Sequence, residues 1–448
     1  MLTKTDFMKY MECPVGLWME KHRPDLIPED TPEVRRVLEM GREVDDFSRK
    51  LFEGGVEVAG YNQEGWQNTK KLIESGVKIL YQPTVVADPI TCRADILEKS
   101  KNTWTLNEVK SATTVKKEYP YDVAFQRICF ENAGIKLDRT NLVHINNQYV
   151  RRGDIQPEKL FVSEDITDMV LEKTDEVKHL IPLALKVLNR REAPDEEMLA
   201  TCPSPRNCEY LNIYLESVGQ IPEEPRIEET TDVAGIAETL AELQYPLYFL
   251  DYETYGSPIP PFDGTRPYQN IPFQYSLGIK DAPDANTRYE KFLARTFKDS
   301  VPGLLAQLRR DIGERGSVIV WNESFEKGCN DEMARMEPDY ADFLKAVNDR
   351  IFDLMVIFKL KNQLYTRNAF QKSASLKMVL PAICPELAYD DLTIQEGATA
   401  SASWPVLTST NTSKADKAKL ADDMLSYCKR DTEAMVCILK KLQQEINK

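Results

Sequence analysis

The first half of the chain alternates between helical and strand-like patterns of apolar residues. Two helical patterns come first, and they are followed by short segments rich in Val, Ile, Thr and aromatic residues, which are typical of strands. The predicted elements are helices at 5–21, 32–52, 121–133 and 165–190 and strands at 79–87, 92–98, 103–110 and 140–146. Because strands and helices are mixed along the chain, this half predicts an α/β core.

The second half starts a new pattern at Tyr245–Asp251, an apolar run that ends at an acid. Further apolar runs predict strands, and helical patterns flank them. The predicted elements are strands at 273–279 and 317–321, helices at 301–313 and 323–335, and a last helical stretch at 414–446 in two pieces. We therefore predict that the second half is a separate region of the same α/β class.

Between these two patterns, residues 218–232 have the composition of a linker. They contain two prolines and five acids and show little apolar periodicity, which is typical of a domain boundary. We therefore predict a first domain at 1–217, an acidic linker at 218–232 and a second domain at 233–448. The length of 448 residues agrees with two or three domains of about 150 residues each.

The charge balance limits the classes of function. Lys and Arg number 57 against 72 Asp and Glu, which gives a net charge of −15. This argues against a protein that coats DNA by electrostatic attraction alone, but not against an enzyme whose clustered carboxylates hold metal ions. A hydrophobic fraction of 42% excludes disorder throughout. Because we find neither a secretory signal nor an apolar run of about 18 residues, we expect a cytoplasmic protein with no membrane partner.

Asp95, Glu108 and Lys110 are the first candidates for chemistry. Glu108 and Lys110 are two positions apart on a predicted strand, so their side chains share a face. If that strand forms a hairpin with the one before it, Asp95 meets them. Two carboxylates can then hold Mg²⁺, while the lysine activates water or neutralises phosphate charge. The alternative is a surface hairpin with an alternating ion pair.

These three residues are followed by a predicted helix that carries Tyr121 and Gln126. The ordered set resembles the PD-(D/E)XK nuclease superfamily, in its Cas4/RecB-like branch. The resemblance implies a restriction-endonuclease-like fold, metal binding by the two acids, a catalytic lysine, and substrate contacts from Tyr121 and Gln126. Relatives often carry a metal-binding histidine on an earlier helix, where this chain offers Glu43 as a weak substitute, and an acid where it has Gln82.

Three of the nine cysteines stand apart, and we interpret the other six as reduced and mostly buried. Cas4-like relatives often hold an iron–sulfur cluster, with one cysteine from the first helix and three from the end of the domain. This chain offers Cys13, Cys202 and Cys208, with Tyr214 where the fourth cysteine is expected. Three thiolates leave open a weak site, an unidentified fourth ligand, a vestigial arrangement, or reduced cysteines packed together.

The second half holds four acidic elements in order. Asp251 and Glu253 lie two positions apart at the end of a predicted strand, so both carboxylates face one side, as two-metal chemistry requires. The other elements are Asn322-x3-Glu326 after a strand, Asp353, and Tyr427-x3-Asp431 within a helix. Each element alone is a weak signal, but the ordered set is specific. The alternative is a domain that keeps these acids for local structure.

This ordered set resembles the DEDD (DnaQ-like) 3′–5′ exonuclease family on an RNase H-like mixed sheet, in its tyrosine-containing DEDDy subtype. The resemblance implies that Asp251, Glu253 and Asp431 ligate two metal ions, Mg²⁺ or Mn²⁺. It also implies that Tyr427 positions the attacking water and that Asn322 contacts the substrate near the scissile bond.

One position departs from the family pattern. Glu326 stands where the family has Asp, and its carboxylate is one methylene farther out. Two alternatives stay open: Glu326 still ligates a metal and acts in catalysis, or the change marks reduced or redirected activity. Asp353 matches a position that is usually outside the ligand shell. The three histidines of the chain all lie in its first half, so a catalytic histidine is excluded from the second.

Taken together, both halves resemble the DUF2779 family, a Cas4-like region fused to a DEDD-like domain, and segments 272–276, 375–381 and 387–392 add to the resemblance. We therefore predict a metal-dependent nuclease that acts on nucleic acid, DNA in preference to RNA, in repair or in defence against mobile elements. The second domain would trim 3′ ends and the first would cut DNA. The alternatives are a catalytically reduced protein that binds nucleic-acid ends, and a scaffold subunit whose acidic surface binds a protein partner.

Overall fold

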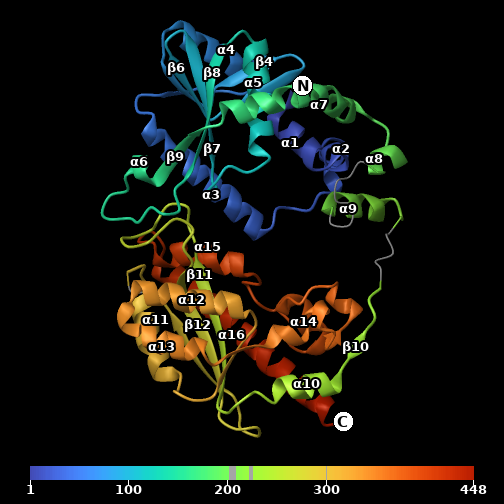
Figure 1. Ribbon diagram of the computed structural model, residues 1–448, viewed down its shortest axis with the longest axis vertical. Helices are drawn as coiled ribbons and strands as arrows, with labels where there is room; N and C mark the ends of the chain where they lie inside the picture. Colours follow the sequence, from blue (N-terminus) through green and yellow to red (C-terminus); the bar gives the residue numbers. More distant parts are fainter. Residues whose placement is uncertain (201–207, 221–225, 299) are drawn as a thin grey trace. The chain divides into compact units, whose positions relative to one another are not determined.

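The computed structural model describes residues 1–200, 208–220, 226–298 and 300–448 (Figure 1). The chain divides into two compact units, Met1–Glu223 and Glu224–Lys448, and the division falls inside the segment predicted as a linker. Each unit is a mixed α/β structure with its own sheets. Within the described ranges, no helix combines the length and the apolar content needed to span a membrane.

The first unit is built on a six-stranded sheet of order β2-β3-β6-β7-β8-β9 and a three-stranded sheet of order β1-β5-β4. β6 and β7 form an antiparallel hairpin, whereas β7 and β8 run parallel. The strands are β1 (Leu2–Thr3), β2 (Val56–Glu57), β3 (Ile79–Tyr81), β4 (Thr84–Ala87), β5 (Ile90–Arg93), β6 (Ile96–Ser100), β7 (Thr103–Lys110), β8 (Leu137–Ile145) and β9 (Phe161–Asp165). The hairpin anticipated from the sequence is therefore present, and it brings the residues around Asp95 next to the end of β7.

Helix α5 is the central helix of the first unit. It is buried along most of its length and packs against α1 and α7. The helices are α1 (Lys4–Glu12), α2 (Pro14–His22), α3 (Pro32–Ser48), α4 (Asn62–Glu74), α5 (Tyr119–Asn132), α6 (Pro157–Leu160), α7 (Thr167–Asn189), α8 (Glu196–Ala200) and α9 (Glu209–Ser217). Because α5 is buried on nearly every side, its buried polar residues Asp122, Gln126 and Arg127 need partners within the protein.

Three predicted elements of the first unit are divided in the structure. The strand expected at 92–98 is divided into β5 and β6, which belong to different sheets. The helix expected at 5–21 is two helices, because Pro14 has no N–H to continue α1 and instead occupies the first turn of α2. The strand expected at 79–87 is divided into β3 and β4 at Gln82, whose φ of 52° is left-handed. Apolar patterning did not reveal these three breaks, since apolar residues continue across each of them.

The second unit contains a five-stranded sheet of order β13-β12-β11-β14-β15. β11 is antiparallel to β12 and parallel to β14, which is parallel to β15. The strands are β11 (Leu247–Tyr255), β12 (Ile271–Lys280), β13 (Arg288–Leu293), β14 (Ser317–Val320) and β15 (Ile351–Asp353), with a separate pair of β10 (Thr230–Thr231) and β16 (Tyr365–Thr366). The helices are α10 (Val233–Leu240), α11 (Ser300–Asp311), α12 (Glu323–Met336), α13 (Ala341–Asn348), α14 (Leu376–Ile383), α15 (Gly397–Thr408) and α16 (Lys414–Ile446).

The core of the second unit surrounds β11 and β12. Nearly every residue of these strands is buried, which requires cover on both faces of the sheet. α16 packs against both strands, and α11 and α12 pack against β12 (Figure 1). Trp404 of α15 stacks on Phe273 of β12 with ring centroids 4.7 Å apart, so α15 is also fixed to this core.

The last helix is one continuous element of 33 residues, not the two pieces that we predicted. It contains neither glycine nor proline, so no residue interrupts its hydrogen bonding. The hydroxyl of Ser413 accepts the N–H of Asp416 at 3.1 Å and caps its start. This continuity fixes the spacing of every residue that α16 presents to the sheet.

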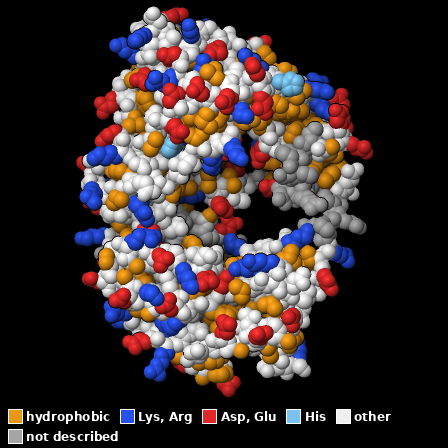
Figure 2. All heavy atoms as spheres, in the orientation of Figure 1, with side chains coloured by type: hydrophobic (Ala, Val, Ile, Leu, Met, Phe, Trp, Pro, Cys, Tyr) orange, Lys and Arg blue, Asp and Glu red, His pale blue; other side chains and the backbone are white. Residues whose placement is uncertain are grey.

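On the faces seen in Figure 2, acidic and basic side chains are interspersed on each unit. The acids of the predicted chemistry, in contrast, are mostly inside the protein. Glu108, Glu253, Glu326 and Asp431 are all buried. Buried carboxylates require partners or cations, so their surroundings decide what they can do.

Candidate functional site

Three acids of the second unit converge from a strand and a helix. Asp251 and Glu253 lie on β11, where alternate residues share a face. Asp431 lies on α16, which packs against that strand. Glu253 and Asp431 are each only 8% exposed. The structure therefore brings together the acids that were predicted from separate motifs.

Hydrogen bonds to β12 fix the position of α16. Gln274 donates its amide N–H to the carbonyl of Met424 at 2.8 Å. The hydroxyls of Ser276 and Thr432 lie 2.8 Å apart. Gln274 and Ser276 are the β12 residues that pair with the two acids of β11. The helical segment between Met424 and Thr432, which carries the predicted tyrosine and acid, is thus held over the acids.

Two further side chains contact these acids. Tyr389, in the loop after α14, donates its hydroxyl to Oδ1 of Asp431. Cys428, on α16, is fully buried and donates its thiol to Oδ2 of Asp251 at 3.4 Å. Sequence reasoning assigned neither. Tyr389 is 42 residues from Asp431, and no local sequence pattern links residues so far apart. Cys428, in contrast, directly follows Tyr427 in the sequence and could have been considered for that reason.

The electrostatic environment favours protonated carboxyl groups. Burial raises the pKa of Asp251 and of Glu253 well above the ordinary value, and the charge of Asp431 adds to both shifts. Burial also raises the pKa of Asp431 to about 6, although hydrogen bonds from Tyr389 and Tyr427 act in the opposite direction. A divalent cation among these groups would offset both the burial and the repulsion.

Glu326 adds a fourth buried carboxyl group. It lies in the first turn of α12 and is 3% exposed, and burial raises its pKa to about 8. Its Oε2 atom is buried with no hydrogen-bond partner in the described parts of the chain. Its charge raises the pKa of both Asp251 and Glu253, so it acts on the same cluster.

Asp353 and Asn322 each stand at the start of a helix, but their side chains make different contacts. Asp353 accepts the N–H of Met355 at 3.1 Å and pairs with Lys359 at 2.9 Å, so it caps the short helix Leu354–Ile357. Asn322 is the exposed N-cap residue of α12 and makes no side-chain capping bond. Asp353 therefore has a local structural role, whereas the Asn322 side chain is accessible.

The donor set of the cluster fits a divalent metal. The ligand atoms of Asp251, Glu253 and Cys428 lie within 4.8 Å of one another. Carboxylate oxygens suit Mg²⁺ and Mn²⁺. Gly397, the first residue of α15, adjoins the group. If this glycine carried a Cβ atom, that atom would lie 3.8 Å from the Tyr427 hydroxyl and 3.9 Å from Oε2 of Glu253. The start of α15 thus lies beside the acids.

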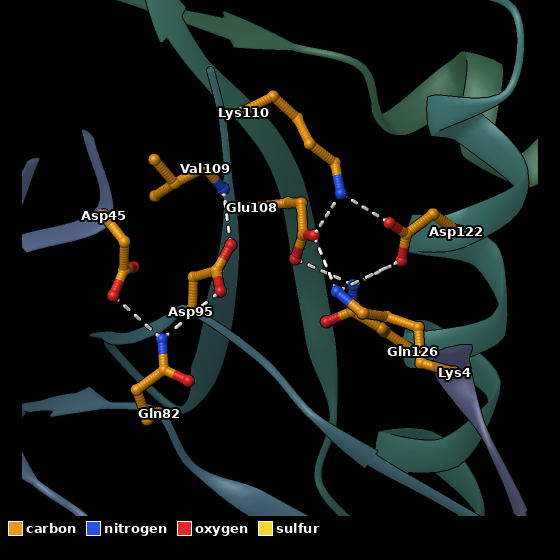
Figure 3. A network of polar contacts seen from close by, with 9 residues as sticks. All are labelled: Lys4, Asp45, Gln82, Asp95, Glu108, Val109, Lys110, Asp122 and Gln126. Atoms are coloured by element: carbon orange, nitrogen blue, oxygen red, sulfur yellow. Dashed lines mark hydrogen bonds and ion pairs between the residues drawn. The ribbon is translucent and has the colours of Figure 1, made fainter. Parts of the chain in front are cut away.

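The first unit holds a second acidic network, in which lysines balance the charge (Figure 3). Lys110 on β7 lies 2.8 Å from Oε1 of Glu108 and 2.6 Å from Oδ2 of Asp122. Lys4, at the start of α1, lies 2.8 Å from the same Glu108 oxygen and 3.5 Å from Oδ1 of Asp122. Gln126 donates to both acids, at 2.8 and 2.9 Å. Two acids, two ammonium groups and one amide thus form a compact network.

The lysines keep this network charged. Burial opposes ionisation of Glu108, but the charges of Lys110 and Lys4 outweigh it and lower the pKa of that carboxyl. Burial likewise opposes protonation of the two lysines, but the acids outweigh it and raise the pKa of both amines. The sequence predicted Glu108 and Lys110 but not Lys4 or Asp122. Lys4 is 104 residues from Glu108, so only the packing of α1 on α5 reveals it.

Asp95 lies beside this network (Figure 3), in the bend directly before β6 and not on the strand where the sequence predicted it. Its Oδ2 atom accepts the N–H of Val109 at 2.8 Å. The Gln82 amide donates to Oδ1 of Asp95 at 3.4 Å and to Oδ2 of Asp45 at 3.2 Å, so it joins two acids. Burial, followed by the charge of Glu108, raises the pKa of Asp95 to about 7. Asp95 therefore changes charge near neutral pH.

Glu43 and Tyr121 are not brought into the network. Glu43 is exposed and pairs with an arginine of its own helix, whereas Asp45, two residues further along α3, points toward Gln82. The hydroxyl of Tyr121 donates to Glu176 of α7 at 2.9 Å. The proposed substitution of Glu43 for a metal-binding histidine is thus not supported, because a step of two residues turns the side chain to a different side of the helix.

The predicted cysteine set is only partly described. The sulfurs of Cys13 and Cys208 lie 3.2 Å apart, at the starts of α2 and α9. Cys202 lies outside the described residues. Tyr214 is buried and donates to a backbone carbonyl, so it supplies no thiolate. Because the described donors fall short of four ligands, we derive no chemistry through an iron–sulfur cluster.

One known family model matches part of the second unit. Residues 248–375 match the model of a domain of unknown function, DUF2779. The DUF2779 match includes Asp251, Glu253 and Glu326 and ends before Tyr389 and Asp431. It therefore covers the strand side of the acidic cluster and not the α16 side.

The curated relatives are themselves uncharacterized. A Mycoplasma genitalium protein named "Uncharacterized protein MG366" is 29% identical over 231 residues, which cover 47% of this chain and 34% of that protein. Its Mycoplasma pneumoniae homolog is 26% identical over 205 residues, or 42% of this chain and 31% of that protein. The chain thus spans about a third of the length of these relatives, and neither they nor the DUF2779 description names an activity.

Proposed function

We propose that the second unit is a metal-dependent 3′–5′ exonuclease that hydrolyses phosphodiester bonds of nucleic acid, DNA in preference to RNA. The observation that carries this proposal is the convergence of Asp251, Glu253 and Asp431 in one buried cluster with Tyr427 beside them. The sheet supports an RNase H-like assignment, since three antiparallel strands are followed by parallel β14 and β15. Phosphodiester hydrolysis by two metal ions needs such a group of carboxylates.

The acids would hold the metal ions. Asp251, Glu253 and Asp431 supply the oxygen ligands, and Glu326 adds the carboxyl group whose Oε2 is buried without a partner in the described ranges. When bound, Mg²⁺ or Mn²⁺ ions would supply an acidified water and stabilise charge on the leaving oxygen. The burial of the acids keeps bulk water away, which strengthens each electrostatic interaction there.

Tyr427 would orient the attacking water. Burial raises the pKa of its hydroxyl, and the charges of Asp431 and Glu253 raise it further. The hydroxyl therefore keeps its proton at neutral pH and acts by hydrogen bonding, not as a base. Asn322, which is exposed at the start of α12, is available to donate a hydrogen bond to a phosphate or sugar oxygen of the strand end.

For the first unit we propose a second nuclease site of the PD-(D/E)XK type, formed by Asp95, Glu108 and Lys110. Because the pKa of Lys110 is raised, its amine stays protonated and would neutralise phosphate charge instead of removing a proton from water. Asp95, with a pKa of about 7, would bind a metal better as pH rises.

One observation favours a second candidate function for this unit, the binding of nucleic-acid ends without hydrolysis. The ammonium group of Lys4 already contacts the Glu108 oxygen that a metal ion would otherwise use, and it also contacts Asp122. A site whose acids are balanced by its own lysines can retain phosphate contacts while losing metal-dependent chemistry.

A cleavage assay with the full-length protein tests these proposals. Single- and double-stranded DNA and RNA, labelled at the 5′ or 3′ end, would be incubated with Mg²⁺ or Mn²⁺. We expect stepwise shortening from the 3′ end that Asp251→Ala abolishes and that the exposed control Asp281→Asn keeps. Cleavage that survives Asp251→Ala and disappears with Lys110→Ala would assign the activity to the first unit and overturn the exonuclease proposal. If Lys110→Ala changes binding but no cleavage product, the end-binding role is favoured.

A further inference from the structure

We propose that Cys428 is a metal ligand, and that with Asp251 and Glu253 it forms a site for a borderline divalent ion of the Zn²⁺ class. The proposal deepens the proposed function, because it rests on the same carboxylate cluster. It adds a sulfur donor and therefore a preference among metals. Neither the sequence motifs nor the relatives assign a role to this cysteine.

The geometry brings the three donors together. Asp251 and Glu253 come from β11 and Cys428 comes from α16, and their ligand atoms lie within 4.8 Å of one another. The Cys428 sulfur is 3.4 Å from Oδ2 of Asp251, and its side chain is fully buried. Within the described residues, one other group of this kind occurs, formed by Cys384, Glu386 and Cys437; in it the two cysteines are joined by a disulfide.

A second observation indicates a cation at the cluster. Glu326 is 3% exposed, and its Oε2 atom is buried with no hydrogen-bond partner among the described residues. Its charge acts on both Asp251 and Glu253. A buried carboxylate oxygen without a donor is costly unless a cation satisfies it. The orphaned oxygen therefore belongs to the same electrostatic group as the three proposed ligands.

The chemistry of the donor set separates two classes of ion. Two carboxylates and a thiolate suit Zn²⁺ and Co²⁺, whereas Mg²⁺ takes oxygen ligands. When a Zn–S bond forms, the S–H bond of Cys428 breaks and its proton leaves to solvent, with no change of oxidation state. An ion held through sulfur would occupy carboxylates that the hydrolytic ions need. We therefore expect Zn²⁺ to compete with Mg²⁺ and to inhibit cleavage.

The test is titration of the reduced, full-length protein with Co²⁺, whose thiolate complexes absorb in the near ultraviolet. The parent protein carries Cys384→Ser and Cys437→Ser, so that the second cysteine group cannot contribute. We expect part of the cobalt–thiolate band to be lost when Cys428→Ser is added. The control Cys329→Ser, another buried cysteine of this unit, should keep the full band.

A second variant separates loss of the ligand from misfolding. Asp251→Asn leaves the sulfur in place but removes a carboxylate, so it should lose the same part of the band with an unchanged circular dichroism spectrum. We also expect Zn²⁺ affinity to fall by at least about 10-fold in Cys428→Ser, since even residues behind the ligands matter by 10- to 100-fold. A band that persists in Cys428→Ser, or that Cys329→Ser removes, overturns the proposal.

The outcomes distinguish this inference from the proposed function. Mg²⁺-dependent cleavage without a Cys428-dependent cobalt band would leave the exonuclease proposal standing and overturn the sulfur ligand. A Cys428-dependent band in a protein that cleaves no nucleic acid would support the metal site and overturn the exonuclease assignment.

Discussion

The two acidic networks differ in how their charge is balanced. In the first unit, Lys4 and Lys110 each contact Glu108 and Asp122 at 2.6–3.5 Å. In the second, the described residues form no ion pair with Asp251, Glu253 or Asp431, and the group contains buried carboxyls with raised pKa values. The first network is complete without an external ion, whereas the second gains most from one. Buried acids are therefore paired with lysines in the first unit, whereas in the second unit they crowd together and their pKa values rise.

The largest expected effect is on the rate of cleavage, when one carboxylate is removed from the cluster of the second unit. Asp251→Asn should lower the rate of 3′-end shortening roughly 1,000-fold or more, because it removes a charged ligand from the centre of the cluster. The measurement is the single-turnover rate on labelled DNA with Mg²⁺. The exposed control Asp281→Asn should change the rate by less than a factor of about two. Equal rates for the wild type and Asp251→Asn would contradict the assignment of the second unit.

The next effect is on the stability of the first unit. Lys4→Met leaves two buried acids with one lysine, so we expect the local free energy of unfolding to fall by about 3 kcal/mol. Hydrogen exchange of β7 peptides, followed by mass spectrometry, measures this energy where the network lies. Lys78→Met, at an exposed position, is the matched control. If β7 exchange is unchanged in Lys4→Met, the lysine does not stabilise the network and the contrast between the units disappears.

The residues of both networks show what a sequence can reveal. Alternation on one strand predicted that Glu108 and Lys110, or Asp251 and Glu253, share a face, because that spacing is local. The mixed α/β class also followed from the order of elements. Lys4 and Tyr389 could not be predicted, since their contacts join segments 104 and 42 residues apart and depend on how helices and loops pack.

The direction of the α3 side chains and the break at Pro14 were missed for different reasons. Glu43 was chosen by its position in the chain, but the turn of α3 directs Asp45 toward Gln82 instead. The division of the first helix at Pro14 was readable from the proline itself, which favours the first turn of a new helix. Local chemistry thus fixes element boundaries, whereas the direction of a single side chain needs the packed structure.

The third effect is on how the stability of the metal-free second unit depends on pH. The pKa of Glu326 is raised to about 8, so the folded state holds a proton that the unfolded state releases near pH 4.5. Stability should therefore fall as pH rises from about 5 to 8, because the folded state binds more protons than the unfolded state over that range. Asp251, Glu253 and Asp431 add to this dependence, and Glu326→Gln removes the part that Glu326 contributes. The variant should therefore be more stable than the wild type at pH 9, by at most about 5 kcal/mol, which is 1.36 kcal/mol for each unit of the shift in pKa.

Thermal unfolding in the presence of a chelator, between pH 5 and 9, measures this difference. Glu323→Gln, in the same turn of α12 but more exposed, is the control and should keep the pH dependence of the wild type. Added Mn²⁺ should reverse the loss of stability at high pH in the wild type. If Glu326→Gln shows the same pH dependence as the wild type, Glu326 is solvated in the folded state and the expectation is wrong.

The smallest effect tests the hydrogen bond from Tyr389 to Asp431. Tyr389→Phe removes one donor from a buried carboxylate, so we expect the rate of cleavage to fall about 10-fold, the order of a hydrogen bond to a charged group. The loss should appear in kcat and not in KM, because Asp431 would hold metal and not the substrate. Tyr340→Phe, outside the cluster, should leave both constants unchanged. A rise in KM alone would place Tyr389 at the substrate and would leave Asp431 positioned by Tyr427 and the backbone of α16.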